Sequence, residues 1–154
     1  MTCCFTGHRD LPKPDSDAYK ELLASLEAAV RDALREGCTR FLIGGAKGFD
    51  LLAGEWILAC RAIDPCVSLA VYVPYRGQAN AYSPTDAKRY RALLDAADET
   101  VVLNETYRHG CMRERNARMV QDADLCIAYV RRRPSGSAMT MQMAEKKGIP
   151  VFRI

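Results

Sequence analysis

Short apolar runs and amphipathic stretches alternate along the whole chain. Six runs have the composition of strands covered on both faces, at residues 3–6, 40–43, 67–73, 100–103, 125–130 and 151–154. Between them, apolar positions recur every three or four residues, which predicts helices. This order predicts parallel strands joined by right-handed crossovers. The expected fold is a single-domain, Rossmann-like three-layer α/β/α sandwich with a mainly parallel sheet, spanning residues 1–154.

Capping and stop signals mark the ends of the helices. The first helix follows Ser16 or Asp17 and stops at Gly37, and a later one opens with an N-cap serine and a proline in Ser83-Pro84-Thr85-Asp86. Three more helices are predicted from about residues 51–61, 112–122 and 137–147. Trp56 and the apolar residues of the helix after Ser83 would suit either the core or a dimer surface, so a homo-oligomer stays open.

Composition narrows the class of protein. The 154 residues are 49% hydrophobic and 27% charged, enough for an apolar core without disulfides. Seven cysteines with no Cys-x-x-Cys pair, and only two histidines, predict a reduced cytoplasmic chain without a zinc site. No signal peptide or membrane span is visible, so no membrane partner is expected. The net charge of +3 argues against nucleic acid as a partner and suits a small anionic ligand.

The turns that follow the strands carry the polar chemistry. In a parallel sheet, the ligand crevice lies at the carboxyl ends of the strands. The turn at residues 44–50 combines Gly44, Gly45 and Gly48 with Ala46, so its backbone can approach a phosphate closely at a helix start. Asp50 has two readings there, as a helix cap or as a partner of a ribose hydroxyl.

Two other turns add basic and aromatic groups. After the first apolar run come Gly7, His8 and Arg9, and the arginine could hold a phosphate or carboxylate while the histidine fits a hydrogen-bonding or packing role. In the helix after residue 110, Asn116 interrupts an apolar stripe that begins at Met112. Arg115 beside it predicts an Arg–Asn pair oriented toward the crevice.

The last turn offers a second place for an anion. Ser135, Gly136 and Ser137 put small residues and hydroxyls at a helix start. Arg131 to Arg133 precede them and read as a solvated rim that could attract phosphates. Met139 and Met143, at helical spacing, are expected in the core.

Three ordered motifs carry a resemblance to a known family. They are Thr-Gly-His-Arg at residues 6–9, Gly-Gly-Ala-Lys-Gly-Phe-Asp at 44–50, and Gly-Cys-Met-x-x-Arg-Asn at 110–116. Together they resemble the bacterial and phage YpsA-like proteins of the SLOG superfamily, which also contains the DNA-processing protein DprA and the LOG-type phosphoribohydrolases. The resemblance covers nearly the whole chain.

The resemblance implies a pocket for a nucleotide or nucleotide-derived ligand of NAD or ADP-ribose type. Carried over by position, its residues are Gly7, His8, Arg9, Gly44, Gly45, Gly48, Asp50, Tyr107, Gly110, Arg115 and Asn116, to which the turn chemistry adds Ala46, Ser135, Gly136 and Ser137. The family's last motif usually reads Gly-Gly-Thr, so the sequence at residues 135–137 departs from it.

Two functions are favoured, and a third, a DNA-associated protein by analogy with DprA, is disfavoured by the mild charge and the absence of an interleaved basic and aromatic surface. The first is binding or sensing of the nucleotide-like ligand, with a small phosphorylated molecule as partner and no cofactor assigned. The alternative is a hydrolase that cleaves an N-glycosidic or phosphoester bond, with Asp50, Glu114 or Glu145 as the acid and His8 assisting. The LOG-type catalytic glutamate is replaced here by Gln142, which favours the binding function.

Overall fold

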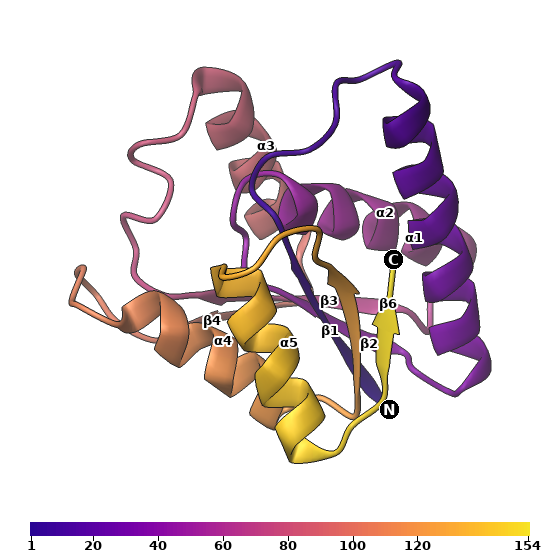
Figure 1. Ribbon diagram of the computed structural model, residues 1–154. Helices are drawn as coiled ribbons and strands as arrows, with labels where there is room; N and C mark the ends of the chain where they lie inside the picture. Colours follow the sequence, from indigo (N-terminus) through magenta and orange to yellow (C-terminus); the bar gives the residue numbers. More distant parts are fainter.

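A single parallel sheet organises the chain. The computed structural model describes residues 1–154 (Figure 1). The strands are β1 (Thr2–Gly7), β2 (Arg40–Ile43), β3 (Ser68–Val73), β4 (Glu99–Val102), β5 (Leu125–Tyr129) and β6 (Val151–Arg153), and the helices are α1 (Asp17–Arg35), α2 (Phe49–Ile63), α3 (Pro84–Ala96), α4 (Cys111–Gln121) and α5 (Gly136–Lys147). All strand pairs are parallel and the order is β4-β3-β2-β1-β5-β6. From β1 the chain adds β2, β3 and β4 on one side of the sheet and then β5 and β6 on the other. The strand order therefore reverses between β1 and β5, and a ligand crevice is expected at this point.

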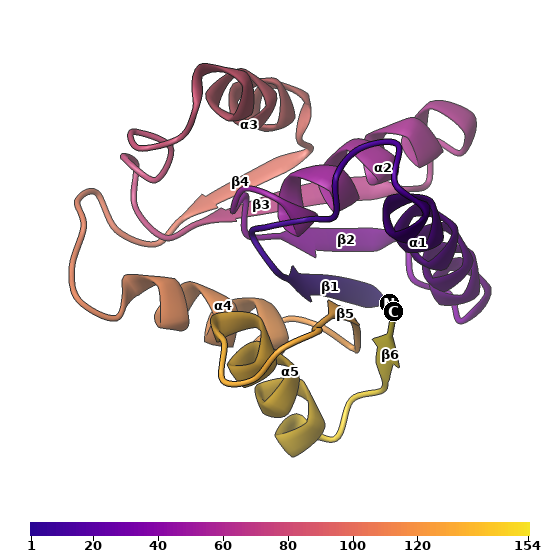
Figure 2. The same cartoon turned by 45° about the horizontal axis from the view of Figure 1, so that its top comes forward.

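Helices cover both faces of the sheet. Figure 2 shows α1, α2 and α3 on one side and α4 and α5 on the other. Alternation along β1 produces this division: Cys3 and Phe5 belong to the larger core with α1 and α2, whereas Cys4 packs into a smaller core with α4 and α5. The three-layer α/β sandwich predicted from the alternation is therefore confirmed.

Local signals set the helix ends as expected, with one exception. Ser16 and Ser83 are N-caps whose side chains accept hydrogen bonds from backbone N–H groups, and Gly148 ends α5 in a left-handed conformation. Helix α2 begins earlier than the apolar stripe suggested because Gly48, with φ +82°, turns the chain directly into it.

Two further features bear on the expectations from composition. All seven cysteines are free thiols, and five of them are buried. No helix is both long enough and apolar enough to cross a membrane.

Candidate functional site

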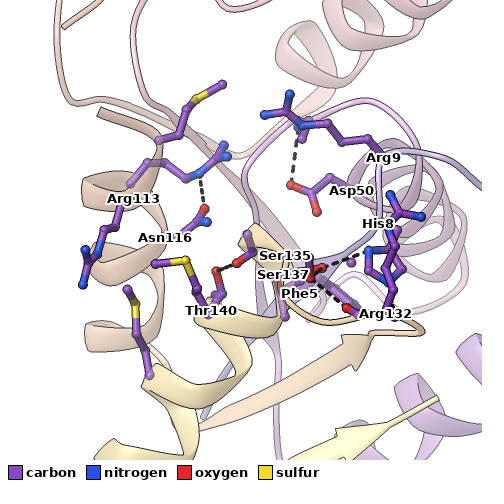
Figure 3. A pocket seen from close by; sticks show the side chains of 18 of the residues that line it. Phe5, His8, Arg9, Asp50, Arg113, Asn116, Arg132, Ser135, Ser137 and Thr140 are labelled. Carbon is purple, nitrogen blue, oxygen red and sulfur yellow. Dashed lines mark hydrogen bonds between the residues drawn. The ribbon is translucent and has the colours of Figure 1, made fainter. Parts of the chain in front are cut away.

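A cavity of about 440 Å³ opens at the carboxyl ends of β1 and β5, between the start of α5 and the first turns of α4 (Figure 3). Ten of the residues expected at a site line it: Gly7, His8, Arg9, Ala46, Asp50, Arg115, Asn116, Ser135, Gly136 and Ser137. They come from three strand-to-helix turns and from the first half of α4, which the reversal of strand order at β1 brings together.

The other five expected residues lie outside the cavity. Gly44, Gly45 and Gly48 shape the turn before α2 but do not line the cavity. Tyr107 is 64% exposed in the loop before α4, with its ring edge-on to Tyr75 at 5.5 Å, and Gly110 is the N-cap of α4. Their places follow from the loop between β4 and α4, whose course the sequence pattern does not encode.

Asp50 binds its own turn. Its Oδ2 accepts hydrogen bonds from the backbone N–H groups of Gly44 at 2.9 Å and Ala46 at 3.4 Å. Burial raises the pKa of this carboxyl, while Arg115 and the two N–H donors oppose the rise. The carboxylate thus occupies two of the donors that the glycine-rich turn was expected to offer to a phosphate.

Arg115 is buried at the floor of the cavity. Only 3% of the residue is exposed, and its guanidinium donates to the carbonyl oxygens of Gly44 and Tyr72 and, from Nε at 2.7 Å, to Oδ1 of Asn116. It takes part in no ion pair. Burial lowers the pKa of Arg115, and nearby Asp50 offsets part of that effect. The predicted Arg–Asn pair is present, and its charge lacks a directly bonded carboxylate.

His8 joins two turns rather than facing the cavity as a free base. Its Nε2 accepts the backbone N–H groups of Arg131 at 2.7 Å and Arg132 at 3.2 Å, which requires an unprotonated Nε2. Nδ1 lies 3.2 Å from Oγ of Ser137. Burial lowers the pKa of His8, and the charge of Arg132 lowers it further. The ring is therefore neutral at pH 7 and holds the turn after β5 against β1.

The start of α5 presents unpaired donors to the cavity. Ser135 is the N-cap, and its Oγ accepts from the N–H of Ala138 at 3.1 Å. The N–H groups of Gly136 and Ser137 have no partner in the chain, and a Cβ added at Gly136 would meet open space. The helix dipole places positive potential at the same point.

Four arginines and two aspartates line the cavity, a local net charge of +2. Arg132 forms a two-pronged ion pair with Asp10, at 2.7 and 2.6 Å, which lowers the pKa of that aspartate to about 2. Arg9 and Arg113 make no ion pair or side-chain hydrogen bond, so their charges are free for a ligand. The Asp10–Arg132 pair was missed because its members lie 122 positions apart in sequence.

Methionines form one wall of the cavity. Met112 of α4 and Met139 and Met143 of α5 line it, and Met139 is 41% exposed. The sequence placed these side chains in apolar stripes that pack on the sheet, but helical spacing does not tell which edge of a stripe overlooks a crevice. Phe5, Thr6 and Thr140 also line the cavity; Thr6 belongs to the motif at residues 6–9, but none of the three was assigned to the site.

The other acids expected for a hydrolase lie elsewhere. Glu114 is tied to Arg108 and Asn104, and Glu145 pairs with Arg153, and neither lines the cavity. Asp50 and Asp10 are the carboxylates of the cavity, and both are held by hydrogen bonds within the chain. No three histidine, cysteine or acidic side chains are grouped so as to bind a metal ion.

Two solved structures of DNA processing protein A share the fold. The protein from Helicobacter pylori, studied for its single-stranded DNA binding mode, superposes with a TM-score of 0.68 at 20% identity over 99% of this chain and 64% of its own. The protein from Streptococcus pneumoniae superposes with a TM-score of 0.67 at 19% identity, over 99% of this chain and 49% of its own. The chain thus spans about half to two thirds of their lengths.

These neighbours correct the expected partner. A small phosphorylated molecule was expected and nucleic acid was called unlikely, but this expectation is wrong, because the Helicobacter pylori protein, which shares this fold, binds single-stranded DNA. The expectation relied on the mild net charge of +3 and on the absence of an interleaved basic and aromatic surface in the sequence. Binding responds to the local field of a crevice, and four arginines line this one.

Sequence relatives and a family model agree on the family. A UPF0398 protein of Bacillus velezensis is 28% identical over 92% of this chain and 82% of its own length, and one of Halalkalibacterium halodurans is 27% identical over 80% and 67%. The family model YpsA, described as "YspA SLOG family", matches residues 3–149. The sequence motifs and the parallel fold are consistent with this match, and the chain belongs to the YpsA family of SLOG proteins.

Proposed function

We propose that the cavity binds a nucleotide unit of a single-stranded nucleic acid. The phosphate would lie at the start of α5, within reach of Arg9 and Arg113, and the sugar and base would extend along the methionine wall. The fold shared with the single-stranded DNA-binding protein of Helicobacter pylori supports nucleic acid as the class of partner.

The main support for the proposal is that Arg115 is buried and forms no ion pair. Its guanidinium is almost fully buried, lines the cavity and has no carboxylate in ion-pair contact. A buried charge without a directly bonded carboxylate is costly even with Asp50 nearby, and the cost falls when a further anion approaches. A phosphate in the cavity would supply that negative charge.

The remaining polar groups of the wall support the same ligand. The unpaired groups are donors: the guanidinium groups of Arg9 and Arg113 and the backbone N–H groups of Gly136 and Ser137. Donors grouped at a helix start bind phosphate or carboxylate oxygens, and an arginine can bind two of these oxygens at once.

The shape of the cavity favours a single strand over a duplex. The site is a concavity between α4 and α5 rather than a raised helix or strand that could enter a groove. A base paired in a duplex would have to leave its stack to enter, at a cost of a few kcal/mol. Bases of a single strand enter without breaking a pair.

Fluorescence anisotropy with a labelled dT10 oligonucleotide tests the proposal. We expect saturable binding to dT10, weaker binding to a duplex of the same length, and affinity that falls with salt by about 0.7 log units per log unit for each phosphate contact. Arg113→Ala should weaken binding roughly 10-fold or more, because a charge-assisted hydrogen bond contributes about 1.5–3 kcal/mol. Arg91→Ala, which removes the same charge from an exposed site on α3 outside the cavity, should leave binding unchanged.

Three results would count against the proposal. The first is no saturable binding to dT10. The second is binding that Arg9→Ala and Arg113→Ala leave unchanged, which would place the strand elsewhere on the surface. The third is competition by thymidine monophosphate at the same concentration as dT10, which would identify a free nucleotide as the ligand.

A further inference from the structure

The amide of Asn116 has a defined orientation. Nε of Arg115 donates to its oxygen Oδ1 at 2.7 Å, and an arginine side chain has no acceptor to offer to the amide nitrogen. The oxygen of Asn116 must therefore face Arg115, which leaves the two N–H donors of Nδ2 on the other side. Asn116 lines the cavity and is only partly buried, and its one side-chain hydrogen bond within the chain is through Oδ1, so Nδ2 is accessible from the cavity.

Three methionines share this part of the cavity with the donor. Met112 lies one turn before Asn116 on α4, and Met139 and Met143 face the same cavity from α5. In Figure 3, Asn116 lies on the α4 side of the cavity, away from His8 and Arg132, with Ser135 and Ser137 between them. The cavity thus has one end at the start of α5 and a second end lined by the three methionines together with Asn116, Arg113 and Thr140.

The two ends correspond to the two halves of a nucleotide. Methionine side chains are polarizable and pack well against aromatic rings. A donor set in such a wall would hydrogen-bond to an acceptor on the edge of a base that lies against it. Without that partner, the donor would be covered and left unsatisfied, which costs about 1–3 kcal/mol.

We propose that the slot between α4 and α5 is a nucleobase subsite in which Asn116 Nδ2 donates to a base acceptor, such as a pyrimidine carbonyl oxygen. This inference rests on the proposed function and adds the specificity of one end of the cavity. Arg115 then has two roles: it balances the phosphate charge, and it fixes the Asn116 amide in the orientation that presents a donor.

The test compares two hexanucleotides, dT6 and the same strand built from 2,4-difluorotoluene nucleosides, which keep the shape of thymine but lack its strong carbonyl acceptors. The readout is the ratio of the two affinities, measured by anisotropy. For the unaltered protein we expect dT6 to bind more tightly, and we expect Asn116 to account for about 3- to 10-fold of that preference, the contribution of one hydrogen bond.

Two variants of the same residue isolate the donor. Asn116→Asp retains an oxygen for Arg115 Nε but removes the Nδ2 donors, and Asn116→Ala removes both. Each should reduce the dT6 preference by about 3- to 10-fold. The ratio is unaffected by the general weakening that the new negative charge of Asn116→Asp produces. Asn80→Ala, an exposed asparagine outside the cavity, should keep the full preference.

The outcomes separate this inference from the function on which it rests. If dT6 binds and Arg113→Ala weakens it, but Asn116→Asp and Asn116→Ala keep the preference, the base subsite is refuted and the phosphate site stands. If the unaltered protein shows no preference for dT6, the subsite is also refuted. If neither hexanucleotide binds, both proposals fail.

Discussion

Gly48 offers a quantitative test of how the two turns beside the cavity are joined. It is the N-cap of α2, with φ +82° and ψ −121°, a region that side chains disfavour. A Cβ there would overlap the backbone carbonyl of Arg9. The next residue, Phe49, donates its N–H to His8 O at 3.0 Å, so any shift that relieves the overlap also strains this link.

The expected cost of Gly48→Ala follows from these two contributions. The backbone conformation costs about 1–3 kcal/mol for a residue with a Cβ, and a lost hydrogen bond adds about 1 kcal/mol. We expect the free energy of unfolding to fall by about 2–4 kcal/mol, and the melting temperature by roughly 5–15 °C for a chain of this size. Because Arg9 shifts as well, binding of dT10 should weaken.

Urea unfolding followed by circular dichroism measures this cost, and Gly136→Ala is the matched control. Gly136 lies in the first turn of α5 with open space around a Cβ, so alanine should be neutral or stabilise by up to about 1 kcal/mol. If Gly48→Ala and Gly136→Ala unfold at the same urea concentration, the tight contact between the turns is not as described.

Two further predictions concern polar contacts. The pKa of His8 is lowered in the folded protein, so the unfolded chain binds a proton more readily and stability should fall as pH drops below about 6.5. Urea midpoints between pH 7.5 and 5.5 should show a smaller decline in His8→Gln, whereas the exposed His109→Gln should behave as the unaltered protein; equal declines in all three would contradict the predicted role of His8. Lys147 Nζ donates to three carbonyl oxygens at the end of α4, so Lys147→Met should destabilise by about 1–3 kcal/mol in a thermal melt, whereas Lys146→Met should not. If Lys147→Met and Lys146→Met have the same melting temperature, the hydrogen bonds of Lys147 do not contribute to stability.

The local sequence pattern was sufficient to predict the strands and helices, because the residues that start and end each of them lie within a few positions of it. The apolar run at Arg40–Ile43 matches β2 residue for residue, and Ser83 with Pro84 marks the first turn of α3. Caps and turn glycines act within a few residues, so a short window of sequence contains the information. The strand at Glu99–Val102 begins one residue earlier than its apolar run, because an edge strand needs less apolar surface.

The direction in which individual side chains of the site point could not be predicted from the sequence. Asp50 was considered as a helix cap or a ribose partner, yet its carboxylate turns back to the N–H groups of Gly44 and Ala46. Tyr107 was expected at the ligand and instead lies in an exposed loop against Tyr75. Both outcomes depend on how a loop closes in three dimensions, which residue types and spacing do not specify.

The sequence by itself determined the alternation of strands and helices, most of their ends, the parallel sheet and the turns from which a site could be built. Only the tertiary structure decided which of those turns meet. It set Asp10 against Arg132, buried Arg115 without an ion-pair partner, and exposed methionines of two helices to one cavity. The physical reason is that periodicity and capping act over one or two turns of chain, whereas the charge and shape of a cavity depend on strand order and on the rotation of each helix against the sheet.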